Sequence, residues 1–135
     1  MGEDEELEMI KYRMLKNLMK KDFEEKKQVI DKPVEVTDSN FMEIIQRNPF
    51  VVIDCWAPWC APCRAISPII DDMARNYAGR ILFGKLNVDE NQVATTYFQI
   101  MSIPTLLIFK NGKLIDRIIG ALPRHLLEPR ITQYL

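Results

Sequence analysis

Two cysteines separated by two residues, Cys60 and Cys63, carry the chemistry that this sequence most directly suggests. They lie in the stretch "IDCWAPWCAPCRAISP", residues 53–68. Such a pair can supply half of a metal site, close a structural disulfide, or exchange electrons with the disulfide of another protein. The neighbouring sequence favours exchange, because an apolar run typical of a buried strand ends near Ala57 and a helical pattern begins at Cys60.

The start of a helix is a favourable place for a reactive thiol. Unpaired backbone N–H groups and the helix dipole stabilise a thiolate there, so the position itself favours the ionised form of Cys60. Cys63 follows one turn later, close enough to form a disulfide with Cys60 after little backbone movement. We therefore predict that Cys60 is the nucleophile and Cys63 the resolving thiol.

A metal site and a merely structural disulfide are the alternatives for this pair. Structural zinc takes four protein ligands. Beyond the pair, the candidates are Cys55, inside the apolar run, and His125, near the C-terminus, and there is no second Cys-x-x-Cys pair. We expect no metal, and we interpret His125 as a surface or capping residue of a helix.

Composition restricts the class of protein. With 135 residues, 47% hydrophobic and 27% charged residues and a net charge of -1, the chain fits one globular domain without a polyanion-binding surface. We expect no nucleic-acid partner. The start, "MGEDEELEMIKYRM", lacks the pattern of a secretory signal, and no apolar run approaches the roughly 20 residues that span a bilayer. The sequence therefore predicts a cytoplasmic protein without a membrane partner.

An extra helix is expected at the N-terminus, in residues 3–28. Leu7, Ile10, Met14 and Leu18 recur at spacings of three and four, among many acids and bases. Pro33 marks the end of this extension, since the residue before a proline avoids helix. We divide the chain into a charged amphipathic extension, residues 1–31, and a domain, residues 32–135. The extension could dock on the body, pair with another copy, bind a partner, or remain solvated.

Strand and helix patterns alternate through the rest of the chain and end in a hairpin and a helix. This order predicts an α/β fold with a mixed central sheet and helices on both faces. Asp38 or Ser39 is the expected N-cap of the first of these helices, and Pro129 is expected to interrupt the last. The expected strands are 34–36, 50–57, 81–89 and a hairpin within 104–120 around Asn111-Gly112; the expected helices are 37–48, 60–79, 91–100 and 122–135.

"VVIDCWAPWCAPCRAISP", residues 51–68, resembles the active-site segment of the thioredoxin family. "GKLNVDEN" at 84–91, "SIPTLLIFKNGK" at 102–113 and "IIGAL" at 118–122 are similar to later segments of that family, in the same order. The resemblance covers residues 34–135 and implies a thioredoxin fold. The N-terminal helix has no counterpart in the minimal family fold.

The resemblance also implies roles for residues around the cysteine pair. Asp54 corresponds to a buried acid that accepts the proton of Cys63, with a pKa raised by burial. Lys85 corresponds to a lysine near that acid, whose charge offsets part of the desolvation cost. Pro62 would stiffen the turn between the cysteines.

Further residues are implied to bind the substrate. Trp59 would cover the site and contact substrates. Pro104 would follow a cis peptide bond and pack against the cysteine pair. The backbone of Ile103 would then be free to pair with an extended segment of the substrate. Gly120 and Ala121 would line the same groove.

The activity implied is that of a protein disulfide reductase. It would use the Cys60–Cys63 disulfide as its redox group, without a metal or organic cofactor. Its partners would be disulfide-containing proteins and a recycling reductase or low-molecular-weight thiol. The alternatives are a disulfide oxidase or isomerase, and a binding module that uses the N-terminal helix. Ala61-Pro62 replaces the usual Gly-Pro of the family, which we expect to shift the reduction potential.

Overall fold

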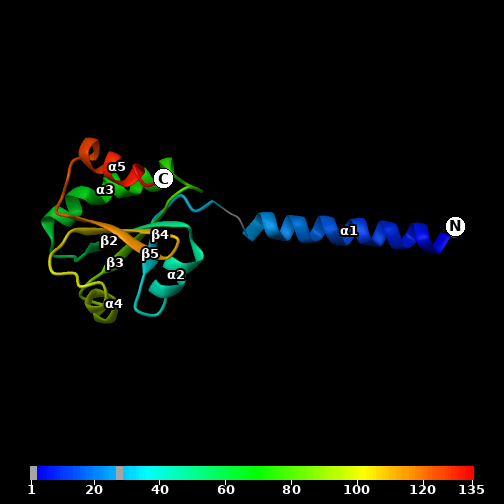
Figure 1. The fold of residues 1–135 in the computed structure, drawn as a ribbon, viewed down its shortest axis with the longest axis horizontal. Helices are drawn as coiled ribbons and strands as arrows, with labels where there is room; N and C mark the ends of the chain where they lie inside the picture. The colour runs from blue at the N-terminus through cyan, green and yellow to red at the C-terminus, as the bar shows by residue number, and fades with distance from the viewer. Residues whose placement is uncertain (1–2, 27–28) are drawn as a thin grey trace.

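The computed structural model describes residues 3–26 and 29–135 (Figure 1). The order of elements agrees with the order expected from the sequence. The elements are α1 (Glu3–Lys26), β1 (Val34–Val36), α2 (Phe41–Arg47), β2 (Phe50–Trp56), α3 (Ala61–Asn76), β3 (Leu82–Asn87), α4 (Gln92–Tyr97), β4 (Thr105–Lys110), β5 (Lys113–Ile119) and α5 (Arg124–Thr132).

One five-stranded sheet, in the order β1-β3-β2-β4-β5, forms the centre of the body. β1 and β2 run parallel to β3, whereas β4 is antiparallel to both of its neighbours. The sheet is therefore mixed, as predicted. β2 lies in its middle, and the first six of its seven residues are buried, which explains its continuous apolar sequence. Asn111 and Gly112 join β4 to β5 with positive φ angles of 52° and 81°, as a tight hairpin of this sequence requires.

Helices cover both faces of the sheet (Figure 1). On one face, Ile66 and Ile70 of α3 pack in a core cluster with Leu127 of α5. On the other face, Phe41 of α2 and Ala94 of α4 belong to a second cluster. The sheet thus separates two apolar cores, and the prediction of an α/β fold with helices on both faces is confirmed.

The prediction that Asp38 or Ser39 is the N-cap of α2 was wrong. α2 starts at Phe41, and its N-cap is Asn40, whose side chain makes no capping hydrogen bond to the helix. The Asn40 side chain instead accepts a hydrogen bond from the Thr37 N–H, in the turn before the helix. Asp38 has another role. Its carboxylate accepts hydrogen bonds from the N–H groups of Val93 (3.4 Å) and Ala94 (2.8 Å), at the first turn of α4. Asp38 therefore joins α4 to the segment before α2.

Pro129 does not interrupt the last helix. α5 continues from Arg124 to Thr132 with Pro129 inside it. Leu127 and Ile131, on either side of the proline, are both buried in the core. Because most helix stability in proteins comes from such packing, one missing N–H does not end the helix here.

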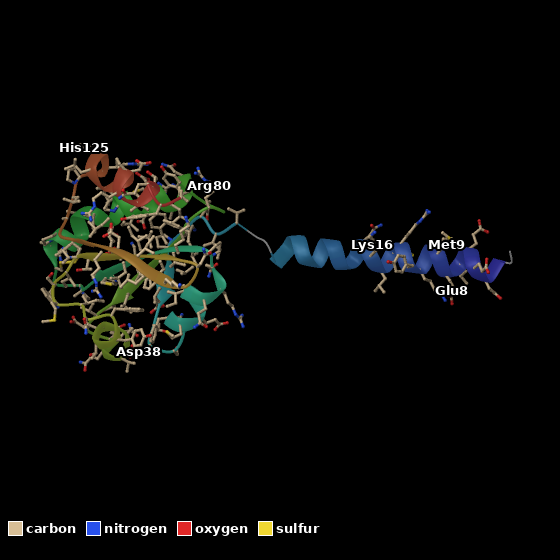
Figure 2. All side chains as sticks on the ribbon, viewed as in Figure 1. Glu8, Met9, Lys16, Asp38, Arg80 and His125 are labelled. Atoms are coloured by element: carbon tan, nitrogen blue, oxygen red, sulfur yellow. A yellow bond between two sulfur atoms is a disulfide. The ribbon has the colours of Figure 1, made fainter. Side chains whose placement is uncertain are left out.

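α1 stands apart from the body in Figure 1, and its described side chains, those of residues 4–17, are all exposed. Glu8, Met9 and Lys16 point into solvent (Figure 2). Residues 27 and 28 of the predicted helix, and the side chain of Leu18, lie outside the described part of the chain. None of the described helices is long and apolar enough to cross a membrane.

Candidate active site

The cysteine pair lies at the turn between β2 and α3. Cys60 is the N-cap of α3, and its Sγ accepts a hydrogen bond of 3.3 Å from the Cys63 N–H. Pro62 occupies the first turn of the helix, where a backbone N–H is not needed and its fixed φ fits. The short sequence Cys-Ala-Pro-Cys therefore starts a helix and directs the Cys63 N–H toward the Cys60 sulfur.

Cys60 and Cys63 form a disulfide, with their Cα atoms 5.3 Å apart. Both residues are almost fully covered, with 4% and 3% of their surface exposed. Trp59, in contrast, is 67% exposed, and its indole N–H donates to Asp89 Oδ2 at 2.9 Å. The sequence reasoning did not single out Asp89, although it lies in the quoted segment "GKLNVDEN". The exposed ring next to the disulfide provides an apolar contact surface.

Asp54 is only 2% exposed, in the middle of β2. Burial raises the pKa of its carboxyl from 3.8 to about 7. The positive charge of Lys85 opposes this rise, and the negative charge of Asp71 adds to it. Asp54 Oδ1 has no hydrogen-bond partner among the described residues. A carboxyl with such a pKa can take up or release a proton near neutral pH.

A small cavity connects this acid with the disulfide. Its volume is about 110 Å³, enough for a few water molecules. Among the described residues, the buried Trp56 Nε1 atom has no hydrogen-bond partner either, so two polar atoms in the cavity wall are available to bind water. The residues that line the cavity are Asp54, Trp56, Cys63, Arg64, Ser67 and Lys85. Asp54 and Cys63 therefore line the same cavity.

Lys85 lies next to Asp54 in the register of β2 and β3, but its ammonium bonds to α3. Nζ donates to Ser67 Oγ at 2.8 Å and forms an ion pair of 3.1 Å with Asp71. Sequence reasoning missed Ser67 and Asp71. A helical spacing of four, from Cys63 to Ser67 to Asp71, would have placed all three on one side of α3.

Next to the disulfide lies the segment before β4. The Ile103–Pro104 peptide bond is cis, as the family resemblance implied, and Pro104 is buried. Ile103 packs against the cluster formed by Ala57, Cys60 and Cys63. Its backbone N–H and C=O make no hydrogen bond with any described residue. They are therefore available to an extended peptide.

Gly120 lies at the end of β5, beside the same segment. Its N–H donates to the Pro104 carbonyl oxygen at 2.9 Å, and its φ of 95° is one that other residues rarely adopt. The next residue, Ala121, is exposed. The structure thus brings Gly120 close to the segment of Pro104, and Ala121 follows it at the surface.

The residues considered as metal ligands do not gather around the pair. Cys55 is buried in the core on the face opposite Asp54, and burial strongly raises the pKa of its thiol. His125 lies at the surface of α5 (Figure 2). Among the described residues, no group of three or more His, Cys, Asp or Glu side chains is arranged to bind a metal ion.

A disulfide-forming cysteine pair at the start of a helix supports thiol–disulfide exchange. This chemistry defines the class of thiol–disulfide oxidoreductases. The family model described as Thioredoxin matches residues 32–133. The chain belongs to the thioredoxin family, and it is a protein disulfide reductase.

Individual relatives agree with this assignment. Over 102 residues the chain is 42% identical to Thioredoxin 1 from a Nostoc species, which covers 75% of this chain and 95% of the relative. It is 43% identical over 100 residues to a thioredoxin from Alicyclobacillus acidocaldarius, covering 74% and 95% of the two chains. A solved thioredoxin structure from Plasmodium falciparum superposes with a TM-score of 0.71 at 34% identity, covering 76% of this chain and 99% of the other.

Proposed function

We propose that Cys60 and Cys63 perform the reduction, in two successive exchange steps assisted by Asp54. One observation carries this proposal. The two cysteines close a disulfide at the first turn of α3, and Cys63 shares a cavity with a carboxyl whose pKa is about 7. The arrangement gives one sulfur a helix start and the other a nearby proton acceptor.

In the first step, the Cys60 thiolate attacks one sulfur of a substrate disulfide. A bond forms between Cys60 Sγ and that sulfur, and the other substrate sulfur leaves as a thiolate that takes a proton from solvent. The N–H groups at the start of α3 favour the attacking thiolate. The product is a mixed disulfide between Cys60 and the substrate.

In the second step, Cys63 attacks the Cys60 sulfur and closes the disulfide. The Cys63 thiol loses its proton to Asp54, through water in the shared cavity, and the second substrate sulfur leaves as a thiolate. Two electrons have then passed from the cysteine pair to the substrate. Lys85 tunes the reaction, since its charge opposes the rise in the pKa of Asp54.

An extended segment of the substrate would bind beside Cys60. The free backbone groups of Ile103 would pair with it as an added strand, with Pro104 keeping them at the disulfide. The exposed ring of Trp59 would cover apolar side chains of the substrate, and Gly120 and Ala121 would form the opposite wall. Pro62 would keep the turn between the cysteines rigid.

Each turnover leaves the pair oxidised, so a source of electrons is required. We assign this task to a recycling reductase or a low-molecular-weight thiol, with disulfide-containing proteins as substrates. The disulfide itself would be the redox group, without a further cofactor. A reducing compartment such as the cytoplasm suits this activity, because thiol pools there keep such pairs reduced.

Reduction of insulin by dithiothreitol, followed by turbidity, tests the proposal with single-cysteine variants. Cys60→Ser should abolish catalysis. Reduced Cys63→Ser, freed of dithiothreitol before insulin is added, should accumulate a mixed disulfide with the substrate, because excess dithiothreitol would cleave that bond. Cys55→Ser is the matched control and should retain activity, because Cys55 is buried away from the pair. Substantial activity in Cys60→Ser, or no trapped complex with Cys63→Ser, would overturn the assignment.

A further inference from the structure

Arg117 links β5 to the end of α4, close to the segment that precedes Pro104. It pairs with Leu107 in the β4–β5 ladder, so its side chain lies on the face of the sheet that α2 and α4 cover. Its guanidinium donates to the carbonyl oxygens of Phe98 and, at 3.4 Å, of Gln99. Arg117 is absent from the ion pairs formed among the described residues.

The two acceptors are carbonyl groups at the end of a helix. α4 ends at Tyr97 with Phe98 as its C-cap, and Gln99 has a positive φ of 54° that turns the chain away. Carbonyls at such an end lack helical partners and carry partial negative charge. A planar guanidinium suits two neighbouring oxygens, because its N–H groups diverge from a rigid plane. Arg117 therefore fixes the point at which the chain leaves α4.

The other end of the same segment is also held. The Thr105 hydroxyl donates to the Ser102 carbonyl oxygen at 2.6 Å, and the Gly120 N–H donates to the Pro104 carbonyl oxygen at 2.9 Å. Only three residues separate Gln99 from Ile103. With both ends held, the intervening chain has little freedom, and the unpaired backbone of Ile103 keeps its place against the cysteine pair.

We propose that Arg117 is a positioning residue for substrate binding, which holds the segment 99–104 so that Ile103 can pair with an extended polypeptide around the substrate's disulfide. The inference rests on the proposed function of the cysteine pair. Among the described residues, Arg117 forms no hydrogen bond or ion pair with Cys60, Cys63 or Asp54, so we expect that the exchange steps themselves do not need it. Its loss should impair substrates that use the Ile103 backbone and spare small disulfides that only reach Cys60.

The test compares insulin with bis(2-hydroxyethyl) disulfide as substrates of Arg117→Met and Arg117→Lys. For Arg117→Met we expect KM for insulin to rise about fivefold with kcat within about twofold, as the loss of a positioning hydrogen bond implies. Turnover of the small disulfide should stay within about twofold. Arg117→Lys should recover part of the loss, since it keeps one donor but not the fork. Arg47→Met, at an exposed arginine of α2 paired with Glu43, is the control.

Equal losses for both substrates would mean that Arg117 serves only general stability, and wild-type values for both would mean that it positions nothing; either result overturns the inference. If Arg117→Met does not fold, the same comparison is decided by Arg117→Lys. Cys60→Ser, assayed in parallel, distinguishes a failure of the proposed function from a failure of the role assigned to Arg117. If Cys60→Ser is inactive and the Arg117 variants have wild-type kinetics, only the role of Arg117 is overturned. If Cys60→Ser keeps its activity, the proposed function is overturned.

Discussion

Asp54 and Lys85 are neighbours in the parallel register of β2 and β3, yet the Lys85 ammonium bonds to Asp71 and Ser67 of α3. The lysine thus acts on the acid by its charge, while Asp54 Oδ1 has no hydrogen-bond partner in the part of the chain that the structure describes. A direct ion pair would favour the ionised carboxylate more strongly. The observed arrangement keeps the pKa of Asp54 at about 7, where the carboxyl can exchange protons.

Asp54→Asn should make the protein more stable above pH 7. Burial raises the pKa of Asp54 from 3.8 to about 7, so the folded protein retains a proton that the unfolded chain has lost between these pH values. The unfolding free energy of the wild type therefore falls as pH rises through this window and stays lower above it. At 1.4 kcal/mol per pH unit, the cost reaches about 4 kcal/mol at most.

Urea unfolding of both proteins between pH 4 and pH 8 measures this difference. The gap between wild type and Asp54→Asn should widen with pH and level off above pH 7. Asp31→Asn, at an exposed residue, provides the control and should follow the wild type. A gap that does not change with pH would show that Asp54 titrates alike in the folded and unfolded chain.

Lys85→Met and Asp71→Asn should move the pKa of Asp54 in opposite directions. The charge of Lys85 lowers this pKa and that of Asp71 raises it, so removal of the lysine raises it above 7 and removal of Asp71 lowers it. A pH titration of the Asp54 carboxyl carbon by NMR, in the oxidised protein, reports the value directly. Shifts of the same sign in the two variants would contradict the electrostatic interpretation.

Gly84→Ala should destabilise the protein because β3 has no room for a methyl group at this position. A Cβ at residue 84 would lie 2.5 Å from Val36 Cγ2, and Val36 is completely buried in β1. Overpacking of this kind costs about 1–3 kcal/mol. Thermal unfolding should show the loss, and the double variant Gly84→Ala with Val36→Ala should recover part of it. An unchanged Tm in the single variant would mean that β1 moves freely away.

Deletion of residues 1–28 should leave disulfide reduction and the Tm of the body nearly unchanged. The described side chains of α1 are all exposed, and the family match begins at residue 32. The alignment with the Nostoc thioredoxin covers 95% of that relative but only 75% of this chain. Insulin reduction and calorimetry of both forms provide the check. A large loss of Tm or activity would reveal a contact between the extension and the body.

Much of the fold could be predicted because its signals are local. The apolar run of β2, the Asn111-Gly112 turn and the alternation of strands and helices each depend on neighbouring residues. Asp38 shows the limit. Its carboxylate accepts from the N–H of Ala94, 56 positions later, and no local pattern distinguishes that role from an N-cap of the nearer helix.

The same distinction applies to the site. The cysteine spacing and the start of a helix were sufficient to predict the place of Cys60, because both lie within one short segment. The partners of Lys85 required the packing of α3 on β3, which depends on the tertiary structure. Arg117 donates hydrogen bonds to the carbonyl oxygens of Gln99 and Phe98, 18 and 19 positions earlier in the chain. No local sequence pattern predicts these bonds.

The reduction potential of the Cys60–Cys63 pair tests the central claim most directly. Equilibration against glutathione or dithiothreitol, followed by the fluorescence of the tryptophans, gives this value. A protein disulfide reductase should have a reduction potential of about -270 mV, the value known for thioredoxin itself. A potential between about -180 and -120 mV, typical of isomerases and oxidases, would contradict the account, because such a pair accepts electrons from protein thiols instead of supplying them.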